Sequence, residues 1–489
     1  MFRFEGPADH RRIRDTLTAG GYDDQGVTEV LGLNPSTLIA KKLPPLLRRT
    51  AGGSPLETLV RLFLLGVRVG RAQATAALGP MDLGWWAAGG LVTVHGDEVE
   101  ATVQLCPYQS LIVAFDFHRR GGGPLPPEHV MGIGASSLTL AGLTVRGPDG
   151  SALDLGTGNG FQAFLAAQHS ERVVATDRNP RAVEMAAFNV ELNDLDAVEC
   201  REGDLFEPVA GETFDLIVSN PPFVVAPDDG LYFLHSGMQG DEVCRTIARR
   251  APHHLSEGGY CQFLANWTAV AGQDWRDRLA GWFDGTGCDA LVLRRGTNAP
   301  DEYAATWIER DEGEAFERSF DAWMDYYADL GVESIDSGLV TMRRSGGGTP
   351  WFRAEDSPDT MTFPAGTDLL GRFAAEDFLA AHPGDDALLA TRFRLAYDVR
   401  LDQQLVAADG GWALLGSQLR RTHGLHWSGG VDVDGAALLA RCDGTETMGA
   451  LLTDLAESVG PDAGASPSVW PATVRRLVAC GFLVPVPGC

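Results

Sequence analysis

The stretch ALDLGTGNG, residues 152–160, decides the fold that this sequence predicts. Four residues suited to a buried strand run directly into a loop with three glycines in five positions. Such a loop lets the backbone pass close beneath a ligand that is bound beyond the carboxyl end of the strand. The stretch therefore predicts the first strand of an α/β sheet, with a ligand site at its turn.

The residues that follow continue the alternation of strand and helix. Further strands are predicted over residues 172–176, 198–201 and 214–219. Between the first two of these, Asn179 can cap a helix that has Pro180 in its first turn. Helical spacing predicts that one face of this helix carries Val183, Ala186, Ala187 and Val190. Strands that alternate with helices indicate a parallel sheet with crossover connections.

Acidic side chains end two of the predicted strands. Asp177 lies 23 residues after Asp154, close to the spacing of about 20 residues at which an acid binds ribose hydroxyls in dinucleotide folds. Asp204 can accept a hydrogen bond from the exocyclic amine of adenine, and Leu205 can cover the ring. Because Phe161 interrupts the G-x-G-x-x-G pattern, the loop favours an adenosine ligand without a pyrophosphate. A glycine turn followed by an acid also occurs as a purely structural feature, so the assignment depends on the next motif.

The segment NPPF, residues 220–223, follows the strand at 214–219 directly. The side-chain oxygen of Asn220 and the carbonyl of Pro221 can both accept from a planar NH2 group, and Phe223 can stack on its plane. Two acceptors would hold the nitrogen with its lone pair toward an electrophilic methyl group. No strong base is needed, because the proton can leave after the transfer. These residues predict methyl transfer from S-adenosylmethionine to a nitrogen atom.

Residues from about 150 to 267 resemble the N-methyltransferases that carry an NPP[Y/F] motif, and most of all the release-factor glutamine N5-methyltransferases. The matching segments are residues 153–160, 175–177, 182–189, 202–208, 214–223 and 236–241. The resemblance implies a Rossmann-like class I methyltransferase fold with S-adenosylmethionine as the cofactor. It also implies that the acceptor is a protein or peptide glutamine, or a related small-molecule amide or amine.

The resemblance assigns roles to residues of this sequence. The cofactor is expected to contact Asp154, Gly156, Thr157, Gly158, Asp177, Asp204, Leu205 and Asn220. Within that set, Asp154 is expected to orient the amino-acid end of the cofactor. The acceptor nitrogen is expected at Asn220, Pro221 and Phe223, while His235 is interpreted as a solvated loop residue. The release-factor enzymes usually have Tyr at the position of Phe223. Several ribosomal-RNA methyltransferases have Phe there, as this sequence does.

Two other functions stay open. The first is N-methylation of a ribosomal-RNA or DNA base, at adenine N6 or guanine N2, because these exocyclic amines are also planar. The second is a non-catalytic winged-helix regulator that binds DNA and the cofactor, although cofactor binding alone does not require Asn220 and Phe223. The net charge of −27, of which residues 121–350 carry −20, disfavours a polyanionic acceptor.

Two glycine- and proline-rich stretches, residues 121–127 and 345–350, divide the chain. They predict three domains, at residues 1–120, 121–348 and 349–489. Helices followed by a strand, a turn and a second strand over residues 91–105 predict a winged-helix-like first domain. Helices near residues 448–458 and 469–480, followed by GFLVP at 481–485, predict a winged-helix-like last domain. The Rossmann-like domain is expected between these two.

The sequence also indicates where the protein acts. Its start, MFRFEG, opens onto charged residues rather than an apolar signal segment, and no uncharged apolar run reaches the ~18 residues of a membrane span. Eight cysteines are scattered without a C-x-x-C pair, which predicts reduced thiols and no metal site. We therefore expect a cytoplasmic protein without a membrane partner.

Overall fold

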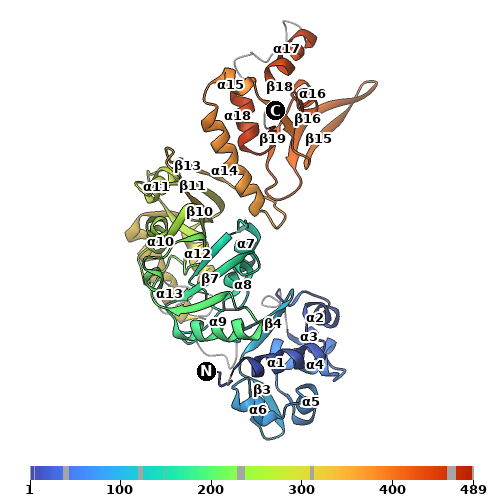
Figure 1. The fold of residues 1–489 in the computed structure, drawn as a ribbon, viewed down its shortest axis with the longest axis vertical. Coiled ribbons are helices and arrows are strands. Elements are labelled where there is room, and N and C mark those ends of the chain that lie inside the picture. The colour runs from blue at the N-terminus through green and yellow to red at the C-terminus, as the bar shows by residue number, and fades with distance from the viewer. Residues whose placement is uncertain are drawn as a thin grey trace. The chain divides into compact units, whose positions relative to one another are not determined.

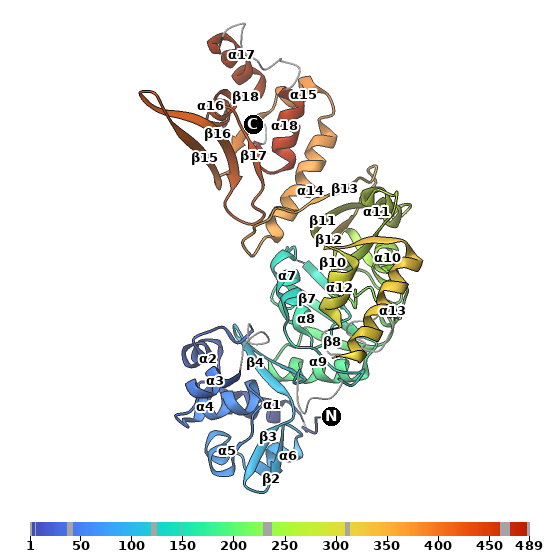
Figure 2. The same ribbon diagram turned by 180° about the vertical axis from the view of Figure 1, so that it is seen from behind.

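The computed structural model describes residues 2–4, 6–36, 43–118, 125–147, 149–227, 237–308, 313–459 and 470–486. Contacts divide the chain into two compact units, which are described separately below. The first unit contains residues 1–141 and 147–355, and the second contains residues 142–146 and 356–489. Figures 1 and 2 show their helices and strands from opposite sides.

An eight-stranded sheet forms the centre of the first unit. Its strands, in order across the sheet, are β13 (Phe352–Asp356), β11 (Cys288–Asn298), β12 (Val332–Arg344), β10 (Leu255–Val270), β9 (Phe214–Ser219), β6 (Asp149–Leu155), β7 (Ser170–Asp177) and β8 (Val198–Glu202). The strands from β10 to β8 are parallel, and β12 is antiparallel to both β10 and β11. The strands predicted over residues 152–219 are confirmed.

The order of the strands determines where a ligand can bind. From β6 the chain adds β7 and then β8 on one side, and it then crosses to the other side for β9 and β10. Side chains that follow β6 and β9 therefore meet at a topological switch point, where open α/β sheets bind their ligands. This parallel arrangement, closed by an antiparallel β12, is the Rossmann-like methyltransferase topology.

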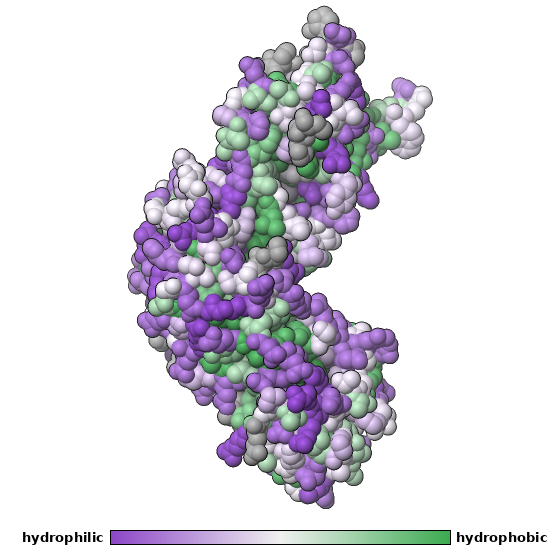
Figure 3. Space-filling model, in the orientation of Figure 1, coloured by the Kyte–Doolittle hydropathy of each residue, from purple (hydrophilic) through white to green (hydrophobic). Residues whose placement is uncertain are grey.

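Helices cover both sides of this sheet, as Figures 1 and 2 show. They are α7 (Ala135–Leu143), α8 (Phe161–Ala166), α9 (Pro180–Leu192), α10 (Glu242–Arg250), α11 (Trp275–Phe283), α12 (Pro300–Trp307) and α13 (Glu314–Leu330). A hydrophobic core between the sheet and α10 and α11 includes Ile217, Phe263 and Trp267. On the face drawn in Figure 3, hydrophilic residues predominate over this part of the chain.

Helix α9 begins as the sequence predicts, because the side chain of Asn179 accepts a hydrogen bond from the amide of Arg181. Of the four residues that helical spacing places on one face, only Ala186 is buried. The residues that α9 buries are Ala182, Met185, Ala186, Phe188, Asn189 and Leu192. The buried face is rotated because α9 packs not only on the sheet but also against α1 (Pro7–Ala19) and β5 (Leu111–Phe115).

Residues before the sheet form further helices and small strands. They are α1, α2 (Asp24–Leu31), α3 (Leu43–Arg49), α4 (Pro55–Leu59), a π-helical turn (Val60–Leu64), β1 (Val69–Gly70), α5 (Arg71–Ala77), α6 (Leu83–Ala88), β2 (Val92–His95), β3 (Glu98–Ala101), β4 (Gln104–Tyr108) and β5. Along the chain, β1 precedes α5 and α6, and β2 and β3 follow them, which is the order of elements in a winged helix. The three strands form the sheet β1-β3-β2. The winged-helix assignment of this block stays a prediction.

Two asparagines of α9 bind the backbone of β5. The Asn189 side chain accepts from the amide of Ala114 at 2.7 Å and donates to the carbonyls of Ala114 and Asn159, both at 2.9 Å. One turn later, Asn193 accepts from the amide of Ile112 and donates to its carbonyl. These bonds replace the strand partner that the edge of β5 lacks on this side, and they connect β5 to the glycine loop.

The second unit contains two small sheets and a helical core. Its elements are α14 (Gly366–Ala381), α15 (Asp385–Leu389), β14 (Arg392–Leu395), β15 (Val399–Ala408), β16 (Gly411–Arg421), β17 (Ser428–Gly430), α16 (Val433–Ala440), β18 (Asp443–Thr447), α17 (Met448–Val459), α18 (Trp470–Ala479) and β19 (Leu483–Pro485). The sheets are β18-β14-β19 and β15-β16-β17. The helices α17 and α18 and the final strand were predicted from the sequence, whereas the winged-helix assignment and the three domain boundaries stay predictions.

No helix in the described part of the chain is long and apolar enough to cross a membrane.

Replacing Asn189 with Ala tests its role in the first unit. Three backbone groups would lose their partner inside a buried site, and each buried unpaired group costs about 1–3 kcal/mol. We expect the free energy of unfolding, measured by urea denaturation, to fall by about 3 kcal/mol or more. Glu191→Ala, at an exposed position of the same helix, is the control and should change it by less than about 0.5 kcal/mol. Equal effects of the two substitutions would contradict this role.

Candidate active site

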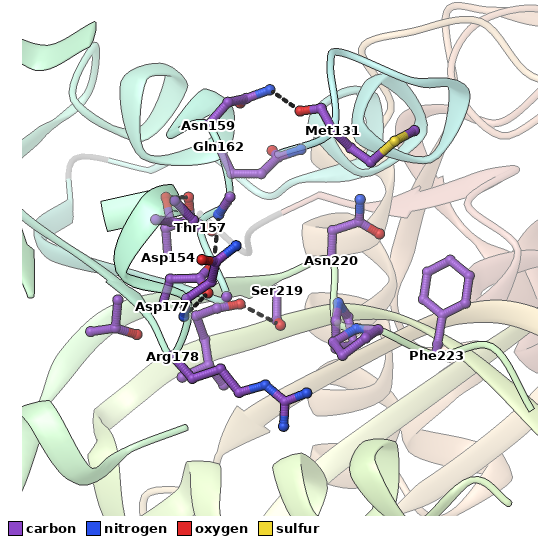
Figure 4. Close-up of a pocket in the computed structure, with 18 of the residues that line it drawn as sticks. Met131, Asp154, Thr157, Asn159, Gln162, Asp177, Arg178, Ser219, Asn220 and Phe223 are labelled. Atoms are coloured by element: carbon purple, nitrogen blue, oxygen red, sulfur yellow. Dashed lines mark hydrogen bonds between the residues drawn. The ribbon is translucent and has the colours of Figure 1, made fainter. Parts of the chain in front are cut away.

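A cavity of about 260 Å³ lies at the switch point of the sheet. Figure 4 shows it, with side chains that converge from the ends of β6, β7 and β9 and from the segment before α7. The ten residues expected at the site all line this cavity: Asp154, Gly156, Thr157, Gly158, Asp177, Asp204, Leu205, Asn220, Pro221 and Phe223. The structure thus brings together every residue that the sequence predicted.

The glycine loop forms an open cradle at one end of the cavity. Gly156 and Gly158 have φ angles of 73° and 57°, in the left-handed region that side chains other than glycine rarely adopt. A Cβ atom at either position would meet no protein atom within 4 Å, so the backbone itself faces the cavity. The amides of Gly156 and Thr157 both donate to the carbonyl of Thr176, which fixes the loop to the end of β7.

Asp177 connects the glycine loop with the start of α9. Its Oδ2 accepts from the amide of Gly158 at 2.8 Å, and its Oδ1 accepts from the amide of Asn179 at 2.9 Å. Burial raises the pKa of Asp177, while these backbone hydrogen bonds act in the opposite direction. Each carboxylate oxygen keeps a lone pair for a further donor, and the side chain borders the cavity.

Asp154 is almost fully buried at the end of β6. Its Oδ2 accepts from the hydroxyl of Thr157 at 2.5 Å and from the amide of Ala163 at 3.0 Å. Burial raises the pKa of Asp154 to about 7, although both hydrogen bonds lower it. The carboxyl group therefore changes its charge close to neutral pH and has an oxygen, Oδ1, that makes neither of these bonds.

Leu205 has an uncommon backbone conformation. Its φ angle is 47°, one of the few positive values at a residue other than glycine among the described positions. Such strain is found where the surrounding structure requires a particular side-chain direction. Leu205 lies partly buried against the core and borders the cavity beside the exposed Asp204.

Asn220 places one polar atom in the cavity without a protein partner. Its Nδ2 donates to the hydroxyl oxygens of Ser136, at 3.2 Å, and of Ser137, at 3.5 Å. Its Oδ1 is buried and accepts no hydrogen bond from any described residue. In Figure 4 the amide nitrogen of Asn220 points toward the segment before α7, and its oxygen lies on the side of Phe223. Asn220 therefore offers an unused acceptor beside an aromatic ring.

The NPPF segment is fixed at both ends. On its N-terminal side, the hydroxyl of Ser219 donates to the carbonyl of Leu155 at 2.7 Å and joins β9 to β6. On its C-terminal side, the amide of Val225 donates to the hydroxyl of Tyr303 at 3.2 Å, and the hydroxyl of Tyr327 donates to the carbonyl of Val225 at 2.8 Å. These tyrosines come from α12 and α13, so two helices far along the chain position the motif.

The structure adds residues that motif reasoning did not find. Ser136, Ser137, Asn159, Gln162, Arg178, Met238 and Trp307 also line the cavity. Asn159 lies within the glycine loop and Gln162 follows it by two residues, so two amide side chains at this loop were a detectable signal in the sequence. Trp307 is more than 80 residues after the motif, and no local pattern connects the two. His235 lies outside the described residues.

The residues present fit S-adenosylmethionine. A backbone cradle, an acid at Asp177 with free lone pairs, and an apolar side chain at Leu205 suit an adenosine group. The buried acceptor on Asn220 is suited to an NH2 group next to the methyl position. Among the described residues, no group of three or more His, Cys, Asp or Glu side chains could hold a metal ion.

Three segments of the chain match known protein families. Residues 133–274 match the methyltransferase small domain. Residues 19–102 match a domain of unknown function, DUF7059, and residues 371–485 match another, DUF7782.

The middle of the chain is also similar to individual proteins. It is 38% identical over 126 residues to the release factor glutamine methyltransferase of Xylella fastidiosa, covering 23% of this chain and 46% of that protein. It is 40% identical over 122 residues to the ribosomal protein uL3 glutamine methyltransferase of Bradyrhizobium diazoefficiens, covering 22% and 38%. It is 35% identical over 134 residues to the ribosomal RNA small subunit methyltransferase C of Salmonella arizonae, covering 27% and 35%.

The chain thus spans less than half the length of these three relatives. Within residues 133–274, the fold, the switch-point cavity and the match to the methyltransferase small domain agree. Residues 133–274 therefore form a class I methyltransferase domain that uses S-adenosylmethionine, and the chain is similar over part of its length to the release factor glutamine enzymes.

Proposed function

We propose that this chain transfers a methyl group from S-adenosylmethionine to the side-chain amide nitrogen of a protein glutamine. The observation that carries the proposal is the buried Oδ1 of Asn220, which has no partner among the described residues. A buried unpaired acceptor costs about 1–3 kcal/mol, and an NH2 group of the acceptor would remove that cost.

Asn220, Pro221 and Phe223 are the proposed catalytic residues. Oδ1 of Asn220 and the carbonyl of Pro221 accept the two hydrogens of the amide, while the Phe223 ring stacks on its plane. When bound, S-adenosylmethionine supplies an electrophilic methyl group on a positively charged sulfur. The nitrogen held by these residues would accept that methyl group in exchange for one of its protons, which would leave to solvent. The contribution of the protein is orientation rather than strong base catalysis.

The cofactor-binding roles belong to the same proposal. Asp177 accepts from the ribose hydroxyls, with Gly156, Thr157 and Gly158 beneath the cofactor. Asp204 accepts from the adenine amine, and Leu205 covers the ring. Asp154 faces the cationic amino group at the other end of the cofactor, where a carboxylate is electrostatically favourable.

The cavity wall on the acceptor side favours a neutral group. Phe223, Val224, Met238 and Trp307 border the cavity there, and none of them can neutralise a charged amine. An amide is planar and uncharged, so it can lie against these side chains without the cost of burying an unpaired charge. The similar proteins of Xylella and Bradyrhizobium are glutamine methyltransferases of release factor and of ribosomal protein uL3, which supports a protein glutamine.

A nucleic-acid base is the second candidate, and the similarity to the Salmonella ribosomal RNA enzyme favours it. The block before the sheet offers little support for it. Helix α6, which would be the recognition helix of a winged helix, has the sequence LGWWAA and carries no Arg or Lys. The tip between β2 and β3 is Gly96-Asp97, and the carboxylate of Asp97 would repel phosphates. The non-catalytic alternative leaves the unpaired oxygen of Asn220 without a purpose.

We place the reaction in the cytoplasm. Cys106, Cys200, Cys244, Cys261, Cys288 and Cys442 form no disulfide bond, and such reduced thiols persist in a reducing compartment.

Labelled methyl transfer tests the proposed function. Purified protein and S-adenosylmethionine with a tritiated methyl group are added to a lysate of source cells that lack the protein. We expect label in material that protease degrades and nuclease does not. Alkaline hydrolysis should release it as volatile methylamine, because an N-methyl amide yields methylamine and a methylated amine side chain does not. Label that nuclease removes would identify RNA or DNA as the methyl acceptor in place of protein. No label above a boiled-protein control would contradict both the protein and the nucleic-acid candidates.

The pKa of Asp154 predicts how cofactor binding depends on pH. The cationic end of the cofactor favours the ionised carboxylate, so binding below pH 7 must also remove the proton that the raised pKa retains. The dissociation constant, measured by calorimetry, should therefore rise as the pH falls from 7.5 to 5.5, by at most about tenfold per unit.

Asp154→Asn is the matched control for that measurement. It should bind the cofactor more weakly at pH 7.5 and with little change toward pH 5.5, because it has no proton to lose. Thermal unfolding of both proteins checks that the substitution leaves the fold intact. Parallel pH profiles of the two proteins would rule out Asp154 as the group that titrates.

A further inference from the structure

We infer that Ser136 and Ser137 are positioning residues that set the direction of the Asn220 amide and so keep its oxygen turned toward the acceptor nitrogen. This inference rests on the proposed function, because it gives the two serines a task in the same reaction. Neither residue belongs to the glycine loop or to the NPPF motif. Both lie in the first turn of α7 and line the cavity together with Asn220.

The contacts of Asn220 define this task. Its Nδ2 donates to the hydroxyl oxygen of Ser136 at 3.2 Å and to that of Ser137 at 3.5 Å, while its Oδ1 stays buried and unpaired. An amide NH2 group has two hydrogens, so the two hydroxyls can accept both. Every hydrogen of the side chain then has a partner, and only the acceptor remains for a ligand.

The opposite orientation of the amide is less favourable. Rotating the side-chain amide by 180° would place the oxygen against the serines and both hydrogens in the cavity. Two buried donors would then be unpaired, which costs more than the one unpaired acceptor of the observed orientation. In that orientation, the NH2 group of Asn220 would also face the NH2 group of the substrate, donor against donor. The serines therefore select the orientation of the Asn220 amide in which its oxygen can bind the NH2 group of the substrate.

The serines are themselves held in place from the cofactor side. Nε2 of Gln162 donates to the backbone carbonyl of Ser137 at 2.8 Å, and Nδ2 of Asn159 donates to the carbonyl of Met131 at 2.8 Å. Asn159 belongs to the glycine loop, and Gln162 lies in the first turn of the helix that follows it. Figure 4 shows the bond from Asn159 to Met131 above the cavity and Gln162 beside it. The loop that forms the cofactor cradle thus also positions the serines against Asn220.

A double-mutant cycle separates positioning from a general structural effect. Ser136→Ala and Ser137→Ala should each lower kcat about 5- to 10-fold, as expected for losing one hydrogen bond, with cofactor affinity unchanged. Ser137→Thr keeps the hydroxyl and should retain most of the rate. In the Asn220→Ala background, the serine substitutions should cause no further loss. Thr139→Ser, on the same helix but not at the cavity, is the control and should transfer methyl at the wild-type rate.

An acceptor-independent measurement accompanies the cycle. In protein with 15N-labelled asparagine, the side-chain amide signal of Asn220 is the one that disappears in Asn220→Ala. In the presence of S-adenosylhomocysteine, its NH2 protons should exchange with solvent slowly. In Ser136→Ala/Ser137→Ala, the exchange should be at least about tenfold faster, because both hydrogen bonds are lost.

The outcomes distinguish this inference from the proposed function. Unchanged exchange in the double serine variant would overturn the inference, as would serine effects of the same size with and without Asn220. Serine substitutions that weaken cofactor binding would also overturn it, because they would show direct contacts with the cofactor. If Asn220→Ala transferred methyl at the wild-type rate, the proposed function would fail, and the exchange measurement alone would decide whether the serines orient the amide.

Discussion

The decisive feature of the candidate site is a buried amide oxygen on Asn220 that accepts a hydrogen bond from no described residue. A buried polar atom without a hydrogen-bond partner lowers the stability of the folded protein by about 1–3 kcal/mol. The surrounding contacts prevent the side chain from relieving that cost. Ser136 and Ser137 accept from the amide nitrogen, and the segment that continues from the motif is fixed by the hydroxyls of Tyr303 and Tyr327. An acceptor held in this way is preorganised for a ligand that carries an NH2 group.

The topology of the sheet explains why this oxygen lies next to a cofactor cradle. The strands β6 and β9 are parallel neighbours, so the loops that follow them open at the same edge. The bond from Ser219 to the carbonyl of Leu155 joins the two strand ends, and Asp177 holds Gly158 by its amide. The cofactor cradle and the oxygen of Asn220 are therefore parts of one hydrogen-bonded edge of the sheet. A change at either part is expected to be felt at the other.

Motif reasoning predicted the strands between residues 152 and 219 and the cap at Asn179. The ten residues that it assigned to the site all line the cavity. These features depend on local patterns, such as glycine turns, strand ends and prolines, whose geometry is set within a few residues. It did not predict that α9 buries Asn189, because that burial comes from bonds to a strand about 75 residues earlier. It also missed Ser136, Ser137 and Trp307, since their roles come from tertiary contacts across the cavity.

The most direct test of the account compares two properties of Asn220→Ala. The account predicts that calorimetry gives nearly the same S-adenosylmethionine dissociation constant as for the wild-type protein, because the amide binds the acceptor rather than the cofactor. It predicts that methyl transfer falls by about 10²–10³, the usual effect of removing one positioning hydrogen bond from a water-poor site. Transfer at the wild-type rate would make the NPPF segment a strand terminator only and would contradict the account.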